Sequence, residues 1–182
     1  MGAELRQIRD DPFEQLLQLE SRLRLARLDI VAGQTETWTG LGFRMGDLWF
    51  VVPKEEVREV INPPPVTRVP NARPWLTGVA NVRGGLLTVL DLHQFLGEPA
   101  AQPGRLQRVL VLNSERLPVG FLVDEVAGQR QFVPQEQRRE PVPGSEAYGP
   151  YLLGAFVREG HTWLVCSLHK ITQSDVFKHA GW

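Results

Sequence analysis

Asn81 and Arg83 are the two polar side chains that local folding does not explain in the apolar segment 78–97, GVANVRGGLLTVLDLHQFLG. Side chains alternate along a strand, so residues 81 and 83 project toward the same side of a strand that begins at Val79. The planar guanidinium of an arginine binds carboxylates and carbonyls through paired hydrogen bonds. The pair therefore indicates recognition of another molecule. A second interpretation stays open, in which Arg83 pairs with a carboxylate of its own chain and supports the turn that follows.

The other reactive residue types lack the spacing that catalysis or ligand binding requires. The four histidines form no HxH, HExxH or cysteine–histidine pattern, and they are His93, His161, His169 and His179. Ser167 and Ser174 lack a neighbouring base and a nucleophile elbow. No GxxxxGK[ST] or GxGxxG segment is present to hold a nucleotide. We therefore expect no enzymatic activity, no cofactor and no metal.

Asp124 and Glu125 are adjacent carboxylates, which in some enzymes act together as an acid and a base. Neighbouring residues of a strand point to opposite faces, and the apolar run 119–126 predicts one continuous strand. The two carboxylates are then unable to share a substrate. We expect them to form a charged rim where the strand ends.

The elements around Arg83 follow from local sequence. Gly84 and Gly85 predict a turn, because glycine enters positive φ without steric cost. Residues 86–90, LLTVL, are apolar on both faces and predict a buried strand. Asp91, Gln94 and Gly97 then predict one short helix, as its N-cap, its reciprocal capping partner and its C-terminal stop.

Residues beyond 34 show short β-rich runs separated by Gly and Pro, which is typical of an all-β barrel or sandwich. The predicted strands are 41–44, 49–52, 58–61, 79–82, 86–90, 108–112, 119–126, 130–132, 152–157 and 162–166. Residues 62–65, NPPP, predict a stiff loop, and residues 135–149 a long polar one. This pattern alone does not choose between a sandwich and two barrels.

The first 34 residues predict an N-terminal extension with one amphipathic helix, followed by a β domain over 35–182. Asp11 is a predicted N-cap with a proline at the first helical position. Apolar residues then recur three and four positions apart up to Ile30, as on one face of a helix over 12–32.

Composition sets the broad class of the protein. The 182 residues carry a formal net charge of −1, which argues against nucleic acid as a partner. No run approaches the ~18 apolar residues of a membrane span, and the N-terminus lacks the order of a signal peptide. The single cysteine, Cys166, excludes an internal disulfide and lies in a strand-like run, so we expect a buried, inert thiol. We expect a cytoplasmic protein.

The segment GVxNxRG, followed by VxDL and a helix that ends in LG, resembles the signature of the CheW family of chemosensory adaptors. Further segments that resemble the family are 42–46, 49–53, 57–61, 108–112 and 120–126, so the likeness covers roughly residues 38–173. The phrase GFRMGDLWFVVP and the N-terminal helix most resemble the members that serve systems controlling type IV pili.

This resemblance implies a fold of two small five-stranded, SH3-like β-barrels packed around a hydrophobic groove. It implies a non-enzymatic scaffold that couples the cytoplasmic tip of a methyl-accepting chemoreceptor to the regulatory domain of a CheA-type histidine kinase. The partner-binding residues that it implies are Val57, Glu59, Asn81, Arg83, Val123 and Asp124. An amphipathic receptor helix would lie in the groove with apolar anchors.

Two positions depart from the usual family pattern, and two other functional classes stay open. Thr88 stands where a proline is common, and His93 where an arginine is common, which leaves the choice of partners open. One alternative class is a β-barrel that binds a small ligand or acts as an enzyme, for which the sequence offers only Asp91, His93 and Cys166. The other is a protein-interaction module outside chemosensory signalling.

Overall fold

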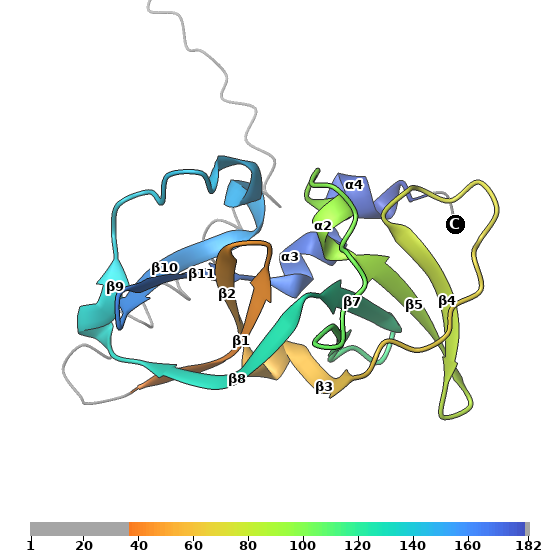
Figure 1. Ribbon diagram of the computed structural model, residues 1–182, viewed down its shortest axis with the longest axis horizontal. Helices are drawn as coiled ribbons and strands as arrows, with labels where there is room; N and C mark the ends of the chain where they lie inside the picture. Colours follow the sequence, from red (N-terminus) through yellow and green to blue (C-terminus); the bar gives the residue numbers. More distant parts are fainter. Residues whose placement is uncertain (1–36, 181–182) are drawn as a thin grey trace, which may run out of the picture. The chain divides into compact units, whose positions relative to one another are not determined.

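The computed structural model describes residues 37–180, which form two mixed β sheets and a few short helices (Figure 1). The predicted all-β core with short helices is confirmed. The predicted helix over 12–32 lies outside the described residues, and the domain boundary at residue 34 stays a prediction.

The first sheet has six strands in the order β8-β1-β2-β11-β10-β9. In chain order they are β1 (Trp38–Met45), β2 (Leu48–Pro53), β8 (Glu125–Phe132), β9 (Gln137–Arg138), β10 (Leu152–Arg158) and β11 (His161–Cys166). Neighbours are antiparallel except β11 and β2, which are parallel. The 3-10 helix η3 (Pro134–Glu136) joins the edge strands β8 and β9, and η4 (Glu146–Tyr151) precedes β10. So short a connection keeps the two edges of the sheet close together.

The second sheet has five strands in the order β3-β6-β7-β5-β4. They are β3 (Val57–Ile61), β4 (Leu76–Val82), β5 (Gly85–Asp91), β6 (Arg108–Leu112) and β7 (Val119–Val123). Only β5 and β7 are parallel. The proline-rich segment after β3 returns to the other edge, where the Thr67 N–H donates to the Val79 carbonyl of β4 at 2.8 Å. The edges of this sheet are therefore also linked by a short stretch of chain.

The structure contains the strands that the sequence pattern predicted, with three corrections. The predicted strand 119–126 is divided at Asp124, because the chain leaves the second sheet there and enters the first. Strand β8 then continues through the predicted separate strand 130–132. The two-residue strand β9 is absent from the prediction, because so short a strand has no alternation pattern, and it makes the first sheet six-stranded rather than five-stranded.

The chain passes between the two sheets at two places. The first is the 3-10 helix η2 (Lys54–Glu56) between β2 and β3, and the second is Asp124 between β7 and β8. Strand β11 is followed by the short helices α3 (Leu168–Gln173) and α4 (Asp175–Lys178), and β5 by α2 (Leu92–Phe95). Side chains from α2, α3 and α4 contribute to the core between the sheets.

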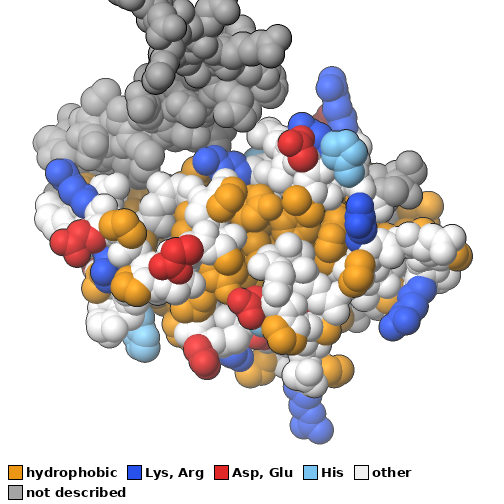
Figure 2. Space-filling model, turned by 90° about the horizontal axis from the view of Figure 1, so that it is seen from above, with side chains coloured by type: hydrophobic (Ala, Val, Ile, Leu, Met, Phe, Trp, Pro, Cys, Tyr) orange, Lys and Arg blue, Asp and Glu red, His pale blue; other side chains and the backbone are white. Residues whose placement is uncertain are grey.

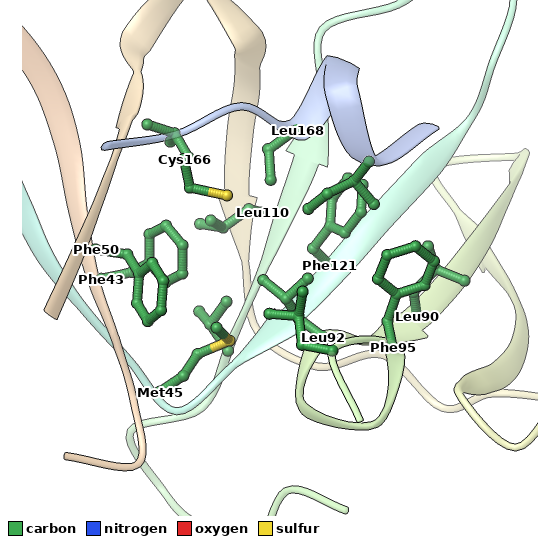
Figure 3. Close-up of a cluster of buried hydrophobic side chains, with 14 of the residues drawn as sticks. Phe43, Met45, Phe50, Leu90, Leu92, Phe95, Leu110, Phe121, Cys166 and Leu168 are labelled. Atoms are coloured by element: carbon green, nitrogen blue, oxygen red, sulfur yellow. The ribbon is translucent and has the colours of Figure 1, made fainter. Parts of the chain in front are cut away.

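The largest buried cluster joins the two sheets (Figure 3). Phe43 and Phe50 of the first sheet stack with ring centroids 5.4 Å apart, and both are buried with Leu110 and Phe121 of the second sheet. Full burial of each such side chain contributes about 1.5–3 kcal/mol. On the face seen in Figure 2, hydrophobic side chains also reach the surface over the middle of the domain, between charged side chains. An apolar zone therefore lies where the sheets meet.

Each sheet also encloses a smaller apolar cluster of its own. In the first sheet it is aromatic, and Phe132 and Phe156 stack with ring centroids 4.6 Å apart. In the second it consists of aliphatic side chains, which are Ala80, Leu87, Val89, Val109 and Val111. Gly42 and Gly120 lie where a Cβ atom would come within 2.9 Å of Trp163 and 2.5 Å of Val109. The inner space of both sheets is therefore filled by side chains.

Candidate interaction surface

Arg83 lies at the tip of the β4–β5 hairpin. Val82 pairs with Gly85, so the two turn residues are Arg83 and Gly84, one position earlier than the sequence predicted. Their φ angles are 51° and 83°, the two positive values of a type I′ turn. This conformation costs a non-glycine residue about 1–2 kcal/mol, and asparagine or glycine is preferred there. A long cation at a strained turn position indicates a role other than folding.

The Arg83 side chain reaches across to β3. Its Nη1 atom lies 2.9 Å from Oε2 of Glu59, while 76% of the arginine side chain and 27% of the glutamate side chain stay exposed. The sequence interpretation in which Arg83 pairs with a carboxylate of its own chain is therefore observed. Exposed ion pairs contribute about 0–1 kcal/mol, which is too little to explain a strained turn residue. The exposed guanidinium has further N–H groups that can donate hydrogen bonds to an acidic partner.

Asn81 stabilises the hairpin turn, and Val57 lies at the start of the strand that carries Glu59. The Asn81 Oδ1 atom accepts a hydrogen bond from the Gly84 N–H at 3.0 Å, so Asn81 stabilises the turn. Val57 is half-buried and packs against the core between the sheets, two residues before Glu59 on β3. The structure thus brings Glu59, Asn81 and Arg83 together at the hairpin tip, with Val57 on the same strand as Glu59.

Leu86 belongs to this surface, although the sequence predicted a buried side chain there. It is 69% exposed, the most exposed large hydrophobic residue in the described part of the chain. Strand β7 pairs with β5 only from Thr88 onward, so Leu86 lies on the part of β5 that extends past β7. Leu86 pairs with Asn81 across the hairpin, beyond the end of β7. Residues 87–90 are buried as predicted.

Val123 ends β7, and Asp124 follows it at the second crossing between the sheets. Val123 is fully buried in the core between the sheets. Asp124 lies at the second crossing between the sheets, and its Oδ2 atom accepts a hydrogen bond from the Gly46 N–H at 2.8 Å. Partner contact at Val123 and Asp124 therefore stays a prediction, and in the free protein both residues make internal contacts.

Asp124 and Glu125 also correct the expectation that they face opposite ways. Because Asp124 lies between two strands rather than inside one, both carboxylates reach Arg44. Arg44 Nε donates to Glu125 Oε2 at 3.1 Å, and its Nη1 atom lies 3.9 Å from Asp124 Oδ2. The two acids and Arg44 form a charge network where the chain crosses between the sheets.

The short helix after β5 begins as predicted. The Asp91 carboxylate accepts hydrogen bonds from the N–H groups of His93 and Gln94 at 3.0 and 3.4 Å, and Gly97 follows the helix with a φ of 86°. Gln94 is not the reciprocal capping partner, because the Asp91 N–H donates to the Trp75 carbonyl instead. The Gln94 Oε1 atom is buried without a hydrogen-bond partner.

Glu56 is a structural residue that the sequence interpretation missed. It is 3% exposed at the first crossing between the sheets. Ser167 Oγ donates to its Oε1 atom at 2.9 Å, and the Leu168 N–H donates to Oε2 at 2.6 Å. The partners lie 111 and 112 positions away, so no local pattern signals this contact.

Cys166 is buried, as predicted, with 2% of its surface exposed. Burial, with the nearby Glu56 carboxylate as a smaller cause, raises the pKa of the Cys166 thiol well above its usual range. The thiol is therefore protonated at neutral pH, and a protonated thiol is a poor nucleophile.

Two further observations concern ligands and membranes. Within residues 37–180, no group of three or more histidine, cysteine, aspartate or glutamate side chains is placed to hold a metal ion. None of the helices in this same part of the chain is both long and apolar enough to cross a membrane.

Comparison with known proteins identifies the class of this protein. Residues 39–176 match the family described as the CheW-like domain, so the chain belongs to the CheW family. A crystal structure of the scaffolding protein TtCheW from Thermoanaerobacter tengcongensis has the same fold. Its TM-score is 0.67 at 17% identity, over 78% of this chain and 96% of that one. The two β subdomains implied by the sequence resemblance are thus those of a CheW scaffold.

Among individual relatives, the chain is similar to PilI of Pseudomonas aeruginosa. The two are 40% identical over 169 residues, which cover 91% of this chain and 94% of PilI. FrzA of Myxococcus xanthus is 34% identical over 119 residues, 65% of this chain and 74% of FrzA. The coverage of PilI is wider than the CheW-like domain, so that alignment extends into the sequence flanking residues 39–176.

Proposed function

We propose that this protein is a non-enzymatic scaffold that couples chemoreceptors to a CheA-type histidine kinase in a bacterial array controlling type IV pili. It works in the cytoplasm and reaches the membrane-bound receptors through its partners. One surface holds the cytoplasmic tip of a methyl-accepting chemoreceptor, and another holds the regulatory domain of the kinase. Weak single contacts gain strength in such an array from high effective concentration.

The observation that carries this proposal is the exposed, strained Arg83 at the hairpin tip of a CheW-like domain. Arg83, Glu59 and Asn81 supply polar contacts there, and Val57 and Leu86 supply apolar ones. A receptor helix with an acidic side chain next to an apolar one fits this combination. The 40% identity to PilI supports the assignment to a pilus system rather than a flagellar one.

The filled interior of each sheet argues against the alternative of a small-ligand barrel. A ligand pocket needs several hundred Å³ of concave space. Here the aromatic cluster around Phe132 occupies the first sheet and the aliphatic cluster around Leu87 occupies the second. Of the three groups considered for catalysis, Asp91 caps a helix, His93 contacts Asp124, and Cys166 is buried.

Reconstitution of a signalling complex tests the proposal. The protein is mixed with the cytoplasmic fragment of a chemoreceptor and a CheA-type kinase from the same genome, and kinase autophosphorylation is measured. We expect stimulation only when all three components are present. No binding to either partner, with a correctly folded protein, would reject the coupling function. Binding to one partner without stimulation would reject the scaffold mechanism.

Leu86→Ala tests the apolar part of the proposed receptor surface. Removing a side chain that becomes buried on binding should weaken receptor binding about 10-fold, since burial of a leucine contributes about 1.5–3 kcal/mol. Because Leu86 is 69% exposed in the free protein, the free energy of unfolding should change by less than about 0.5 kcal/mol. Leu106→Ala is the matched control, since Leu106 is 56% exposed on the loop before β6. If Leu86→Ala and Leu106→Ala changed receptor binding equally, Leu86 would not belong to the receptor-binding surface.

A further inference from the structure

Asp124, at the second crossing between the sheets, contacts both the β1–β2 turn and helix α2. Asp124 Oδ2 accepts a hydrogen bond from the Gly46 N–H in the β1–β2 turn at 2.8 Å. The same oxygen lies 3.0 Å from Nε2 of His93 on α2. A carboxylate only accepts hydrogen bonds, so this contact requires the proton of the imidazole on Nε2. Asp124 thus connects a turn of the first sheet to the helix that follows β5 of the second sheet.

The Asp124 carboxylate is the group that joins the β1–β2 turn to α2 by side-chain contacts. The turn consists of Gly46 and Asp47, both exposed, between the paired residues Met45 and Leu48. Arg44 Nη1 donates to the Gly46 carbonyl at 2.8 Å and Arg44 Nε donates to Glu125 Oε2 at 3.1 Å, so Arg44 ties the turn to β8 rather than to α2. If Gly46 carried a Cβ atom, this atom would lie 4.0 Å from Cε1 of His93, which is van der Waals contact. The imidazole ring therefore lies next to the turn.

The side chains next to the two contact points belong to the core between the sheets. Met45, which precedes Gly46, is 6% exposed, and Leu92, which precedes His93, is fully buried. Figure 3 shows both side chains within the same cluster. Asp124 and His93 are themselves 18% and 13% exposed, so solvent reaches this contact, unlike the Glu56 contact at the first crossing.

We propose that Asp124 and His93 form a latch that holds the β1–β2 turn closed against α2. Release of the latch lets the turn move away from α2 and opens the core at Met45, while the rest of the domain stays folded. Glu56 has no equivalent freedom, because its partners are buried at the start of α3. This inference concerns the motion of the isolated domain and does not depend on the proposed coupling function.

Oxidation of Met45 by hydrogen peroxide measures this opening in the purified full-length protein. The Met45 sulfoxide is quantified by mass spectrometry of the peptide that contains it. In Asp124→Ala and His93→Ala, we expect Met45 to oxidise at least five times faster than in the parent. Asp47→Ala, which removes a carboxylate of the same turn outside the latch, should oxidise at the parent rate.

Cys166 distinguishes local opening from global unfolding, because it lies in the same core as Met45. In separate samples, its alkylation by iodoacetamide should stay as slow in the latch variants as in the parent. Parent-like oxidation of Met45 in both latch variants would reject the latch. A parallel rise of Met45 oxidation and Cys166 alkylation in both would also reject it, since the whole core would then be opening.

Discussion

Replacing Arg83 by asparagine should weaken receptor binding about 30-fold, or about 2 kcal/mol, while the domain melts at the same temperature or higher. Asparagine suits the left-handed conformation of this turn position better than arginine does, so the backbone strain at a φ of 51° decreases. The guanidinium is lost, and with it the group proposed to bind an acidic receptor side chain. Binding is measured by calorimetry and stability by thermal unfolding on one preparation.

The asparagine variant separates two roles that an alanine variant confuses. Alanine would keep the strain of the left-handed turn and remove the side chain at the same time. If Arg83 only supports the turn, Arg83→Asn should bind the receptor as tightly as the parent. That result would show that Arg83 forms the ion pair with Glu59 but does not bind the receptor.

A charge-reversal pair provides the second control. Arg83→Glu combined with Glu59→Arg keeps an ion pair between the same two positions, which are joined at 2.9 Å in the parent. Stability should therefore stay within about 0.5 kcal/mol of the parent value, as for most surface substitutions. Receptor binding should remain impaired, because the outward-facing charge at the turn is reversed. Receptor binding equal to that of the parent would show that affinity does not depend on the sign of the charge at residue 83.

The sequence predicted those features that depend on neighbours along the chain. Asp91 as a helix cap and Gly97 as a helix stop each require only the next few residues, and both are observed. The strand pattern was also predictable, because alternation and glycine breaks are local. The position of the hairpin turn was predicted one residue late, since Gly84-Gly85 signals a turn without fixing which residues occupy its centre.

The errors concern features that depend on where distant strands end. Leu86 is exposed at the end of β5 that extends past β7, and the sequence of β5 does not specify where its neighbour begins. The apolar run 119–126 predicts a continuous strand through Asp124, although the chain changes sheets at this residue. The ion pair between Glu59 and Arg83 forms only after β3 and the hairpin tip come together. Such contacts follow from topology, which a local pattern does not specify.

Glu56→Ala should produce the largest loss of stability, about 3 kcal/mol, because it leaves buried donors without an acceptor. The Ser167 hydroxyl and the Leu168 N–H lose the carboxylate that accepts from them at 2.9 and 2.6 Å. The His169 N–H, at 3.3 Å from the same carboxylate, loses it too. For a domain of this size, the melting temperature should fall by roughly 6–12 °C. Urea unfolding followed by circular dichroism measures the change in free energy.

Two further variants show whether the loss comes from these hydrogen bonds. Glu55→Ala removes the exposed neighbouring carboxylate and should change stability by less than about 0.5 kcal/mol. Glu56→Gln keeps one acceptor oxygen but turns an amide N–H₂ toward donors, so it should still lose about 1–3 kcal/mol. If Glu56→Gln were as stable as the parent, the contact between η2 and the start of α3 would depend on packing of the side chain rather than on its two acceptor oxygens. The carboxylate account of how the chain is fixed between its two sheets would then be wrong.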